Sequence, residues 1–217
     1  MNRPSMPTEL TSSGIVAIAR GASTTHVAAA VEKLVEAGIS CVELTLTMPD
    51  AVDGIASLVS RLGDAACVGA GTVLTTAQAS ACLDAGAKFL VAPSLAPDVV
   101  AFAAEAGAPC LPGALTPSEI VSAWNSGAAG VKLFPASLGG ARYLRDVRAP
   151  LPDIPLIPTG GVAIDDVPAY LAAGAVAVGL GGPLFGDALS GGSLDDLAAR
   201  ARRLVAAVRI AREGRPV

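Results

Sequence analysis

The sequence has few aromatic and few basic side chains. Aromatic residues make up 3% of the 217 residues, the lysines are Lys33, Lys88 and Lys132, and His26 is the single histidine. With a net charge of -4, the chain lacks the basic face that nucleic acid or an anionic membrane requires, so we expect neither as a partner. A small-molecule substrate fits better. His26 lies at an expected helix start, where it is more typical of a solvated side chain than of a metal ligand.

Paired cysteines and long apolar runs near the amino terminus are also missing. Cys41, Cys67, Cys82 and Cys110 are scattered, without a Cys-x-x-Cys pair or the spacing of a zinc site. We therefore expect reduced, buried thiols in a cytoplasmic protein. Residues 1–10 contain two prolines and no long apolar run, so neither a secretory signal nor a transmembrane span is expected.

Short apolar runs alternate with stretches of helical periodicity along the chain. With 52% hydrophobic residues, the chain can bury one substantial core. Each run is bounded by turn residues, and most are separated from the next by a segment long enough for the helix of a parallel βαβ unit. The eight predicted strands are residues 14–19, 39–46, a run that begins at residue 67, 89–92, 109–112, 128–134, 155–158 and 175–180.

Eight βαβ units predict a single-domain α/β fold, the (β/α)8 TIM barrel. We expect an N-terminal leader over residues 1–13 and the barrel over residues 14–217, with a closing C-terminal helix packed outside. The rival fold is a doubly wound open sheet, which normally carries a Gly-x-Gly-x-x-Gly turn after the first strand. Only Arg20-Gly21 follows the first strand here, so the barrel is favoured.

The active site of such a barrel lies at the carboxyl ends of its strands. Two strongly ionisable side chains are predicted within strand ends, Glu43 and Lys132. The full set of expected strand-end residues is Arg20, residues 43–47 up to Thr47, Gly71, Thr72, Pro93, Ser94, Lys132, Phe134, Thr159, Gly160, Gly161, Gly181 and Gly182.

Lys132 lies within the apolar run Val131-Lys132-Leu133-Phe134. Burial disfavours the ammonium form, so the side chain either acts as a free amine that attacks a ketone or extends to the rim of the fold. Glu43 lies within an equally apolar segment. Its burial is costly unless it pairs with a cation or transfers a proton.

Two glycine pairs end the last two predicted strands. Gly160-Gly161 and Gly181-Gly182 occupy the usual barrel position for a phosphate held by backbone N–H groups. Each pair alone is equally typical of a turn. Their occurrence at adjacent strand ends favours an anion site.

Four segments resemble the signatures of the class I 2-keto-3-deoxy-6-phosphogluconate aldolases, a family that includes the 4-hydroxy-2-oxoglutarate and 2-keto-3-deoxy-6-phosphogalactonate aldolases. The resemblance extends from about residue 14 to residue 185, and the motifs occur in the family's order. The segments are Val-Glu-Leu-Thr-Leu (42–46), Gly-Ala-Gly-Thr-Val-Leu (69–74), Val-Lys-Leu-Phe-Pro-Ala (131–136) and Pro-Thr-Gly-Gly-Val (158–162).

The resemblance implies a lyase of carbohydrate metabolism, of the Entner-Doudoroff type, that splits a 2-keto-3-deoxy sugar acid into pyruvate and an aldehyde, usually glyceraldehyde 3-phosphate. It implies that Lys132 forms the Schiff base and that Glu43 is the general acid and base. Thr72 and Thr159 would contact the pyruvyl end of the substrate, and the glycine pairs would hold a distal phosphate. No metal or cofactor is expected because the iminium supplies the positive charge, and family members are typically homotrimers.

Two positions depart from the phosphogluconate-specific pattern. Thr47 stands where an arginine is usual, and Gly182 stands where a serine is usual. An arginine after the first strand, as at Arg20, instead resembles the pattern of the phosphogalactonate branch. We therefore assign Arg20 to the binding of the substrate carboxylate. In the alternative interpretation, Arg20 lies at the rim and pairs with a carboxylate of a helix. An unphosphorylated 2-keto acid such as 4-hydroxy-2-oxoglutarate, and a non-catalytic barrel that binds pyruvate or a sugar phosphate, remain open at this point, as does the preferred C4 epimer.

Overall fold

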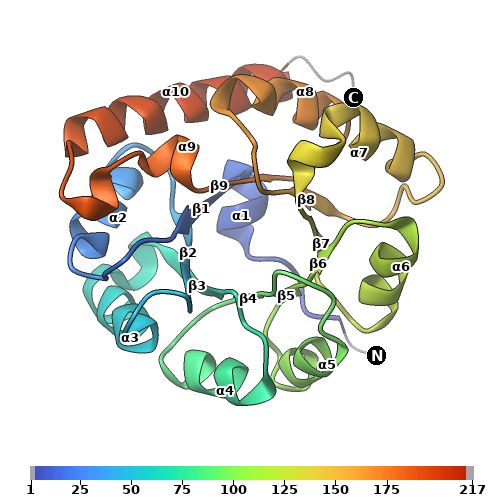
Figure 1. The fold of residues 1–217 in the computed structure, drawn as a ribbon, viewed down its shortest axis with the longest axis horizontal. Coiled ribbons are helices and arrows are strands. Elements are labelled where there is room, and N and C mark those ends of the chain that lie inside the picture. The colour runs from blue at the N-terminus through green and yellow to red at the C-terminus, as the bar shows by residue number, and fades with distance from the viewer. Residues whose placement is uncertain (1–2, 214–217) are drawn as a thin grey trace.

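The computed structural model describes residues 3–213 as parallel strands surrounded by helices (Figure 1). The strands are β1 (Ile15–Ala19), β2 (Cys41–Thr45), β3 (Cys67–Gly71), β4 (Leu90–Val91), β5 (Cys110–Leu111), β6 (Gly113–Ala114), β7 (Val131–Leu133), β8 (Leu156–Pro158) and β9 (Val178–Leu180). The helices are α1 (Thr8–Ser13), α2 (Val27–Glu36), α3 (Ala51–Leu62), α4 (Thr76–Asp84), α5 (Pro97–Glu105), α6 (Pro117–Asn125), α7 (Gly140–Arg148), α8 (Val167–Ala172), α9 (Gly182–Phe185) and α10 (Leu194–Glu213).

The strands form two curled parallel sheets, with the order β5-β4-β3-β2-β1-β9 in one and β6-β7-β8 in the other. This is an α/β barrel-like fold, as the sequence predicted, and closure into a complete (β/α)8 barrel stays a prediction. The predicted strand 109–112 is shortened to β5, because Pro112 has no N–H to donate, and β6 begins directly after this proline. At the other junction, one parallel bridge joins Thr159 to Gly179.

Capping boxes begin two of the helices. Thr75 and Gln78 form the capping box of α4. At α6, Thr116 and Glu119 form the second box, and the Glu119 carboxylate accepts from the Thr116 and Leu115 N–H groups at 2.8 and 3.1 Å. These hydrogen bonds hold the pKa of Glu119 below its ordinary value. The box fixes the direction in which the chain leaves β6.

The core has an outer and an inner part. The outer part lies between the strands and the surrounding helices, as the two-sided burial of a parallel sheet requires. The inner part is a separate apolar cluster on the face of the strands that points away from the helices. Its members are Leu10, Val16, Ile18, Cys41, Cys67, Phe89, Val91, Leu111, Ala129, Ile157 and Ala177.

Helix α1 covers the amino ends of the strands. Figure 1 shows it at the centre of the molecule, behind the strands. Leu10 of α1 is fully buried in the inner cluster, and the Arg212 side chain from α10 donates to the Thr11 carbonyl at 2.9 Å. Residues 8–13, which the sequence analysis assigned to a leader, thus pack against the strands. The domain boundary after residue 13 stays a prediction.

None of the helices within residues 3–213 combines the length and the apolar composition needed to cross a membrane.

Candidate active site

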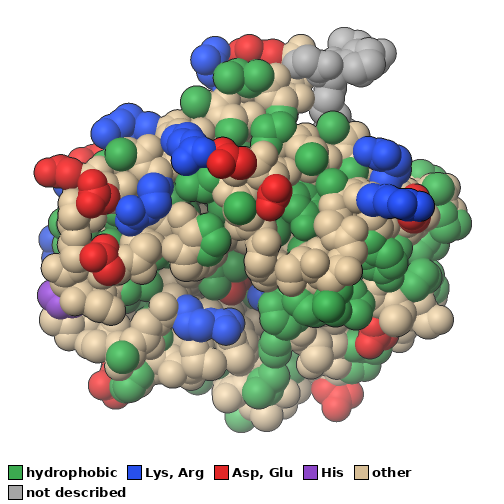
Figure 2. Space-filling model, turned by 45° about the horizontal axis from the view of Figure 1, so that its top comes forward, with side chains coloured by type: hydrophobic (Ala, Val, Ile, Leu, Met, Phe, Trp, Pro, Cys, Tyr) green, Lys and Arg blue, Asp and Glu red, His purple; other side chains and the backbone are tan. Residues whose placement is uncertain are grey.

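A cavity of about 330 Å³ opens at the carboxyl ends of the strands. Figure 2 shows a hollow on this face of the molecule, with a basic side chain at its edge. The cavity is lined by Ile18, Arg20, Lys132, Phe134, Thr159, Gly160, Gly161, Val162, Gly179, Gly181, Gly182 and Pro183. Eight of the residues predicted at the strand ends are therefore brought to one space, and Glu43 lies next to it, beside Lys132.

Strand β7 carries Lys132 into this cavity. Because side chains alternate along a strand, Val131 and Leu133 face the helices while Lys132 faces the interior. Only 5% of Lys132 is exposed, and its Nζ lies 5.3 Å from the centre of the Phe134 ring. The lysine is therefore enclosed rather than extended to the rim.

Glu43 on β2 is the nearest carboxylate to this amine. Its Oε1 lies 3.9 Å from Lys132 Nζ, and the side chain is 2% exposed. That oxygen is buried and has no hydrogen-bond partner within residues 3–213. Burial raises the pKa of the Glu43 carboxyl, although the charges of Lys132 and Arg20 act in the opposite direction. A buried oxygen without a hydrogen-bond partner lowers the free energy of unfolding, so its presence in the fold indicates a function.

Glycines inside two strands make room for the polar groups. A Cβ at Gly71 on β3 would lie 2.5 Å from Glu43 Oε1, and a Cβ at Gly179 on β9 would lie 2.4 Å from Thr159 Oγ1. Any side chain at either position would displace the polar group beside it. From the sequence, Gly179 was given no role, and Gly71 was noted as a strand end and as part of the segment 69–74. The available signal was a glycine within an apolar strand, where it marks a close approach.

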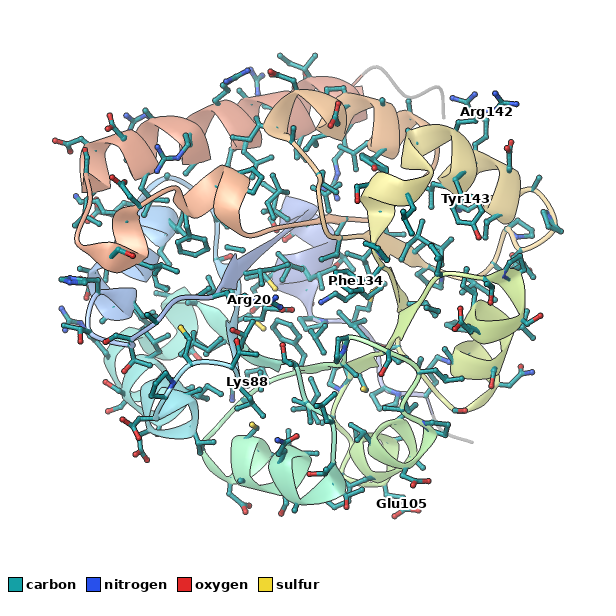
Figure 3. All side chains as sticks on the ribbon, in the orientation of Figure 1. Arg20, Lys88, Glu105, Phe134, Arg142 and Tyr143 are labelled. Carbon is teal, nitrogen blue, oxygen red and sulfur yellow. The ribbon has the colours of Figure 1, made fainter. Side chains whose placement is uncertain are left out.

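Arg20 supplies a positive charge at the cavity mouth. It directly follows β1, is exposed, and lines the same cavity as Phe134, and Figure 3 shows these two residues on opposite sides of the central space. In the described part of the chain, no carboxylate lies within ion-pair distance of its guanidinium. The rim ion pair that we weighed from the sequence is not formed there.

The glycine pairs border the cavity beside Thr159. Gly160 and Gly161 have φ values of +86° and +74°, and a Cβ at Gly160 would lie 2.8 Å from the Phe134 ring. Glycine is required at both because this left-handed backbone disfavours other residues. At Gly182, by contrast, no atom lies within 4 Å of an added Cβ. The usual serine would fit there.

Three predicted substrate-binding residues do not line the cavity. Thr47 is exposed, and its hydroxyl lies 2.9 Å from that of Thr45. Thr72 is half-buried with a φ of +62°. Pro93, two residues after β4, is also half-buried, and its carbonyl lies where a Cβ at Gly113 would be. Their assignment to the substrate stays a prediction.

The metal chemistry of the site follows from its donors. Within residues 3–213, no three His, Cys, Asp or Glu side chains come together in a way that could hold an ion. His26, immediately before α2, is exposed.

The side chains gathered at the site define its possible chemistry. They are the amine of Lys132, the Glu43 carboxyl group with its raised pKa, and the Arg20 guanidinium at the mouth. Such a set suits covalent catalysis on a carbonyl compound that carries an anionic group.

Comparison with known proteins gives consistent matches over most of the chain. The family model "Aldolase: KDPG and KHG aldolase" matches residues 7–198. A Rhizobium meliloti (strain 1021) protein named "Probable 2-dehydro-3-deoxy-6-phosphogalactonate aldolase" is 36% identical over 181 residues, which cover 83% of this chain and 85% of that protein. The Escherichia coli (strain K12) 2-dehydro-3-deoxy-6-phosphogalactonate aldolase is 33% identical over 196 residues, which cover 90% of this chain and 94% of that protein.

A solved structure described as "Native KDPGal structure" superposes with a TM-score of 0.86 at 32% identity, covering 92% of this chain and 96% of that one.

Proposed function

The chain belongs to the KDPG and KHG aldolase family, and we propose that it cleaves a 2-keto-3-deoxy-6-phospho sugar acid, of gluconate or galactonate type, to pyruvate and glyceraldehyde 3-phosphate. The observation that carries this proposal is the enclosed Lys132 amine, 3.9 Å from the Glu43 carboxylate at the carboxyl end of the strands. The protein is an enzyme of the aldolase type.

In the proposed reaction, Lys132 Nζ attacks the C2 ketone as a free amine and expels water, which leaves an iminium. Glu43 then takes the C4 hydroxyl proton as the C3–C4 bond breaks. The bonding electrons move toward the iminium and give an enamine, and the C4 fragment leaves as the aldehyde. Glu43 returns the proton to C3. Water hydrolyses the resulting iminium, which releases pyruvate and restores the amine.

The environment of Glu43 supports this role. One carboxyl group must accept a proton in the cleavage step and donate it in the next, which is most efficient when its pKa approaches the working pH. Burial moves the Glu43 pKa in that direction. Gly71 supports the same role because it leaves the space that the carboxylate occupies.

The phosphogalactonate-type substrate is favoured over the phosphogluconate-type one. The two relatives compared above carry the phosphogalactonate name, and Arg20 lies at the cavity mouth without a carboxylate partner in the described residues. We propose that Arg20 pairs with the substrate carboxylate. The glycine pairs Gly160-Gly161 and Gly181-Gly182 then face the distal phosphate.

A second candidate is an aldolase for an unphosphorylated 2-keto acid such as 4-hydroxy-2-oxoglutarate. The observation that favours it is the open space at Gly182, where no hydroxyl is available to a phosphate. Pyruvate release should therefore be measured by a coupled assay on the gluconate and galactonate epimers, each with and without the phosphate. A kcat/KM that does not depend on the phosphate would reject the phosphorylated substrate.

The covalent step is tested separately. Borohydride added with pyruvate should reduce the iminium and fix a three-carbon adduct on Lys132, which peptide mass spectrometry locates. An unmodified Lys132 in an active enzyme would sink the Schiff-base mechanism.

We also propose that the two sheets are parts of one (β/α)8 barrel in a cytoplasmic homotrimer. The Thr159–Gly179 bridge and the single-residue interval at Pro112 support closure of the barrel. The trimer rests on the family resemblance, and sedimentation equilibrium tests it directly.

A further inference from the structure

A second cavity lies at the opposite end of the strands from the candidate active site. Its volume is about 390 Å³, and its walls come from the segment around α1, from the end of α3 and from the starts of β3, β4 and β5. The lining residues are Pro7, Glu9, Gly63, Asp64, Ala66, Cys67, Lys88 and Pro109. We refer to this space as the floor cavity. It holds one thiol, one ammonium and two carboxyl groups, none of which the aldolase chemistry uses.

Cys67 in the floor cavity has a second thiol directly beside it. Cys41 on β2 is in register with Cys67 on β3, and both belong to the inner cluster. Neighbouring strands are about 4.8 Å apart, which lies within the range of Cα separations that disulfides span, about 4.4–6.8 Å. Both cysteines are free thiols. The pair is therefore placed to form a disulfide between β2 and β3.

The two thiols differ in access to the cavity. Cys41 is fully buried, whereas 4% of Cys67 is exposed and lines the floor cavity. A small molecule that enters the cavity can thus reach Cys67 but not Cys41. The order of reaction follows from this placement: Cys67 reacts first, and Cys41 reacts with it.

Charge and hydrogen bonding also make Cys67 the more reactive of the two thiols. The hydrogen bond between the thiols lowers the pKa of Cys67, and nearby Lys88 adds to this, while burial and Glu9 oppose it. The same hydrogen bond and burial raise the pKa of Cys41 well above its ordinary value. Burial raises the pKa of Cys82 to about 11 and that of Cys110 to about 12. Since the thiolate is the reactive form, Cys67 is the thiol most ready to react.

We propose that the floor cavity is a thiol-oxidation site at which a hydroperoxide oxidises Cys67 and Cys41 closes the disulfide. In the first step the Cys67 sulfur attacks the peroxide, the O–O bond breaks, and sulfenic acid and water or an alcohol are formed. In the second step the Cys41 sulfur attacks Cys67, the S–O bond breaks, and a second water leaves with the thiol proton. The two sulfurs lose two electrons in total, which reduce the peroxide.

This disulfide would connect the floor to the active site through β2 and β3. Glu43 lies two residues beyond Cys41, and β3 carries Gly71, where an added Cβ would meet the Glu43 carboxylate. Directly paired strand residues hold their Cβ atoms about 4.5–5.5 Å apart, at or beyond the upper limit of about 4.5 Å for a disulfide. Closure must therefore draw the two strands together, and the strained bond is easily reduced. Oxidation should therefore lower aldolase turnover reversibly.

The test follows the thiols of the whole protein during titration with hydrogen peroxide. In the wild-type protein, free thiols should fall from four to two, with a loss of two hydrogen atoms in mass and a Cys41–Cys67 crosslinked peptide. Cys67 should be lost at least about tenfold faster than Cys82. A thiol reductant should restore all four.

Two variants and a matched control separate the steps. Cys41→Ser should stop at sulfenic acid, which dimedone traps on Cys67, and Cys67→Ser should leave Cys41 unreacted. Cys82→Ser, a buried cysteine outside the pair, should behave like the wild type. Equal loss of all four thiols, or loss of Cys82 before Cys67, would overturn the proposal. These readouts do not depend on turnover, so the oxidation site stands or fails independently of the proposed aldolase function.

Discussion

The interior of this barrel-like fold differs sharply between its two ends, although the same strands build both. Strand β2 presents Cys41 to the inner apolar cluster and, two residues later, presents Glu43 to Lys132. At the floor, Leu10 of helix α1 packs into the inner apolar cluster, beside the floor cavity of about 390 Å³. At the mouth, the strands end in a cavity of about 330 Å³ that Lys132 lines. Because the side-chain alternation is the same throughout, the difference comes from which residues the strands carry at each end and from what packs against them.

The two ends of the strands contribute to different properties: the inner apolar cluster mainly to stability, and the mouth mainly to catalysis. Apolar side chains of the inner cluster contribute to the free energy of unfolding. At the mouth, a buried carboxylate oxygen without a partner in the described residues lowers that free energy and is retained for the reaction. Substitutions at the mouth should therefore change turnover more than stability, and substitutions at the floor should do the reverse.

Replacing the mouth lysine should have the largest effect. Lys132→Ala removes the amine that forms the iminium, so kcat should fall on the order of 10⁴-fold or more. Lys88→Ala is the matched control because Lys88 is an exposed lysine of the floor cavity. It should keep kcat within about twofold of the wild type. Comparable losses in the two variants would show that the division between mouth and floor does not hold.

Glu43→Gln should lower kcat by about 10²- to 10⁴-fold, because the amide cannot transfer the proton. Its effect on stability has a definite sign. The pKa of Glu43 in the folded protein is raised above its ordinary value of 4.5. Between the pKa of the unfolded chain and that of the folded protein, the folded protein therefore binds more protons. The wild type then loses stability as the pH rises through that window, whereas the glutamine variant has no carboxyl group to titrate there. Urea unfolding across a pH series measures the free energy of unfolding of both proteins. A glutamine variant that becomes less stable relative to the wild type as the pH rises would contradict the raised pKa of Glu43.

A floor substitution should show the opposite pattern. Leu10→Ala leaves a cavity in the inner cluster and should reduce the free energy of unfolding by about 2–5 kcal/mol. The kcat of the folded fraction should stay within about twofold, because Leu10 does not line the mouth cavity. Chemical denaturation and active-site titration give the two quantities. A large loss of kcat with unchanged stability would reverse the comparison.

Substitutions at two glycines of β3 compare the mouth with the inner cluster within one strand. A Cβ at Gly71 would meet Glu43 Oε1, and one at Gly69 would meet the Phe89 ring, each at 2.5 Å. Gly71→Ala should displace the carboxylate and lower kcat by about 10²-fold. Gly69→Ala should instead overpack the inner cluster and cost about 1–3 kcal/mol of stability with little change in kcat. Steady-state kinetics and urea unfolding on both variants decide the outcome, and equal kcat values would reject the assigned role of Gly71.

Local patterns in the sequence account for most of the elements but not for their meeting points. The apolar strands were predicted because their cause, a short apolar run, lies within a few residues, and the capping boxes at Thr75 and Thr116 are equally local patterns. The interruption at Pro112 was also readable, since proline has no N–H for the ladder. Helix α1 was missed because one buried leucine in six mostly polar residues resembles a solvated leader.

The candidate site shows the same limit more clearly. Alternation along β2 and β7 indicates that Glu43 and Lys132 face inward, but their 3.9 Å separation depends on the register of all the strands between them. No local pattern contains that register. Thr47, Thr72 and Pro93 were placed by the same strand-end rule and lie outside the cavity lining, because a loop directs its side chains independently of the strand that it follows.

The smallest expected effect is a gain at the mouth. Gly182→Ser adds a hydroxyl where no atom lies within 4 Å of the new Cβ, so the backbone need not move. One added hydrogen bond, worth about 0.5–1.5 kcal/mol, should lower KM for the phosphorylated substrate by about two- to tenfold. The unphosphorylated substrate lacks the acceptor, so its KM should not change, and neither should the urea midpoint. An equal decrease in KM for both substrates would mean that Gly182 does not face the phosphate, and the anion site would then have to be sought elsewhere on the cavity wall.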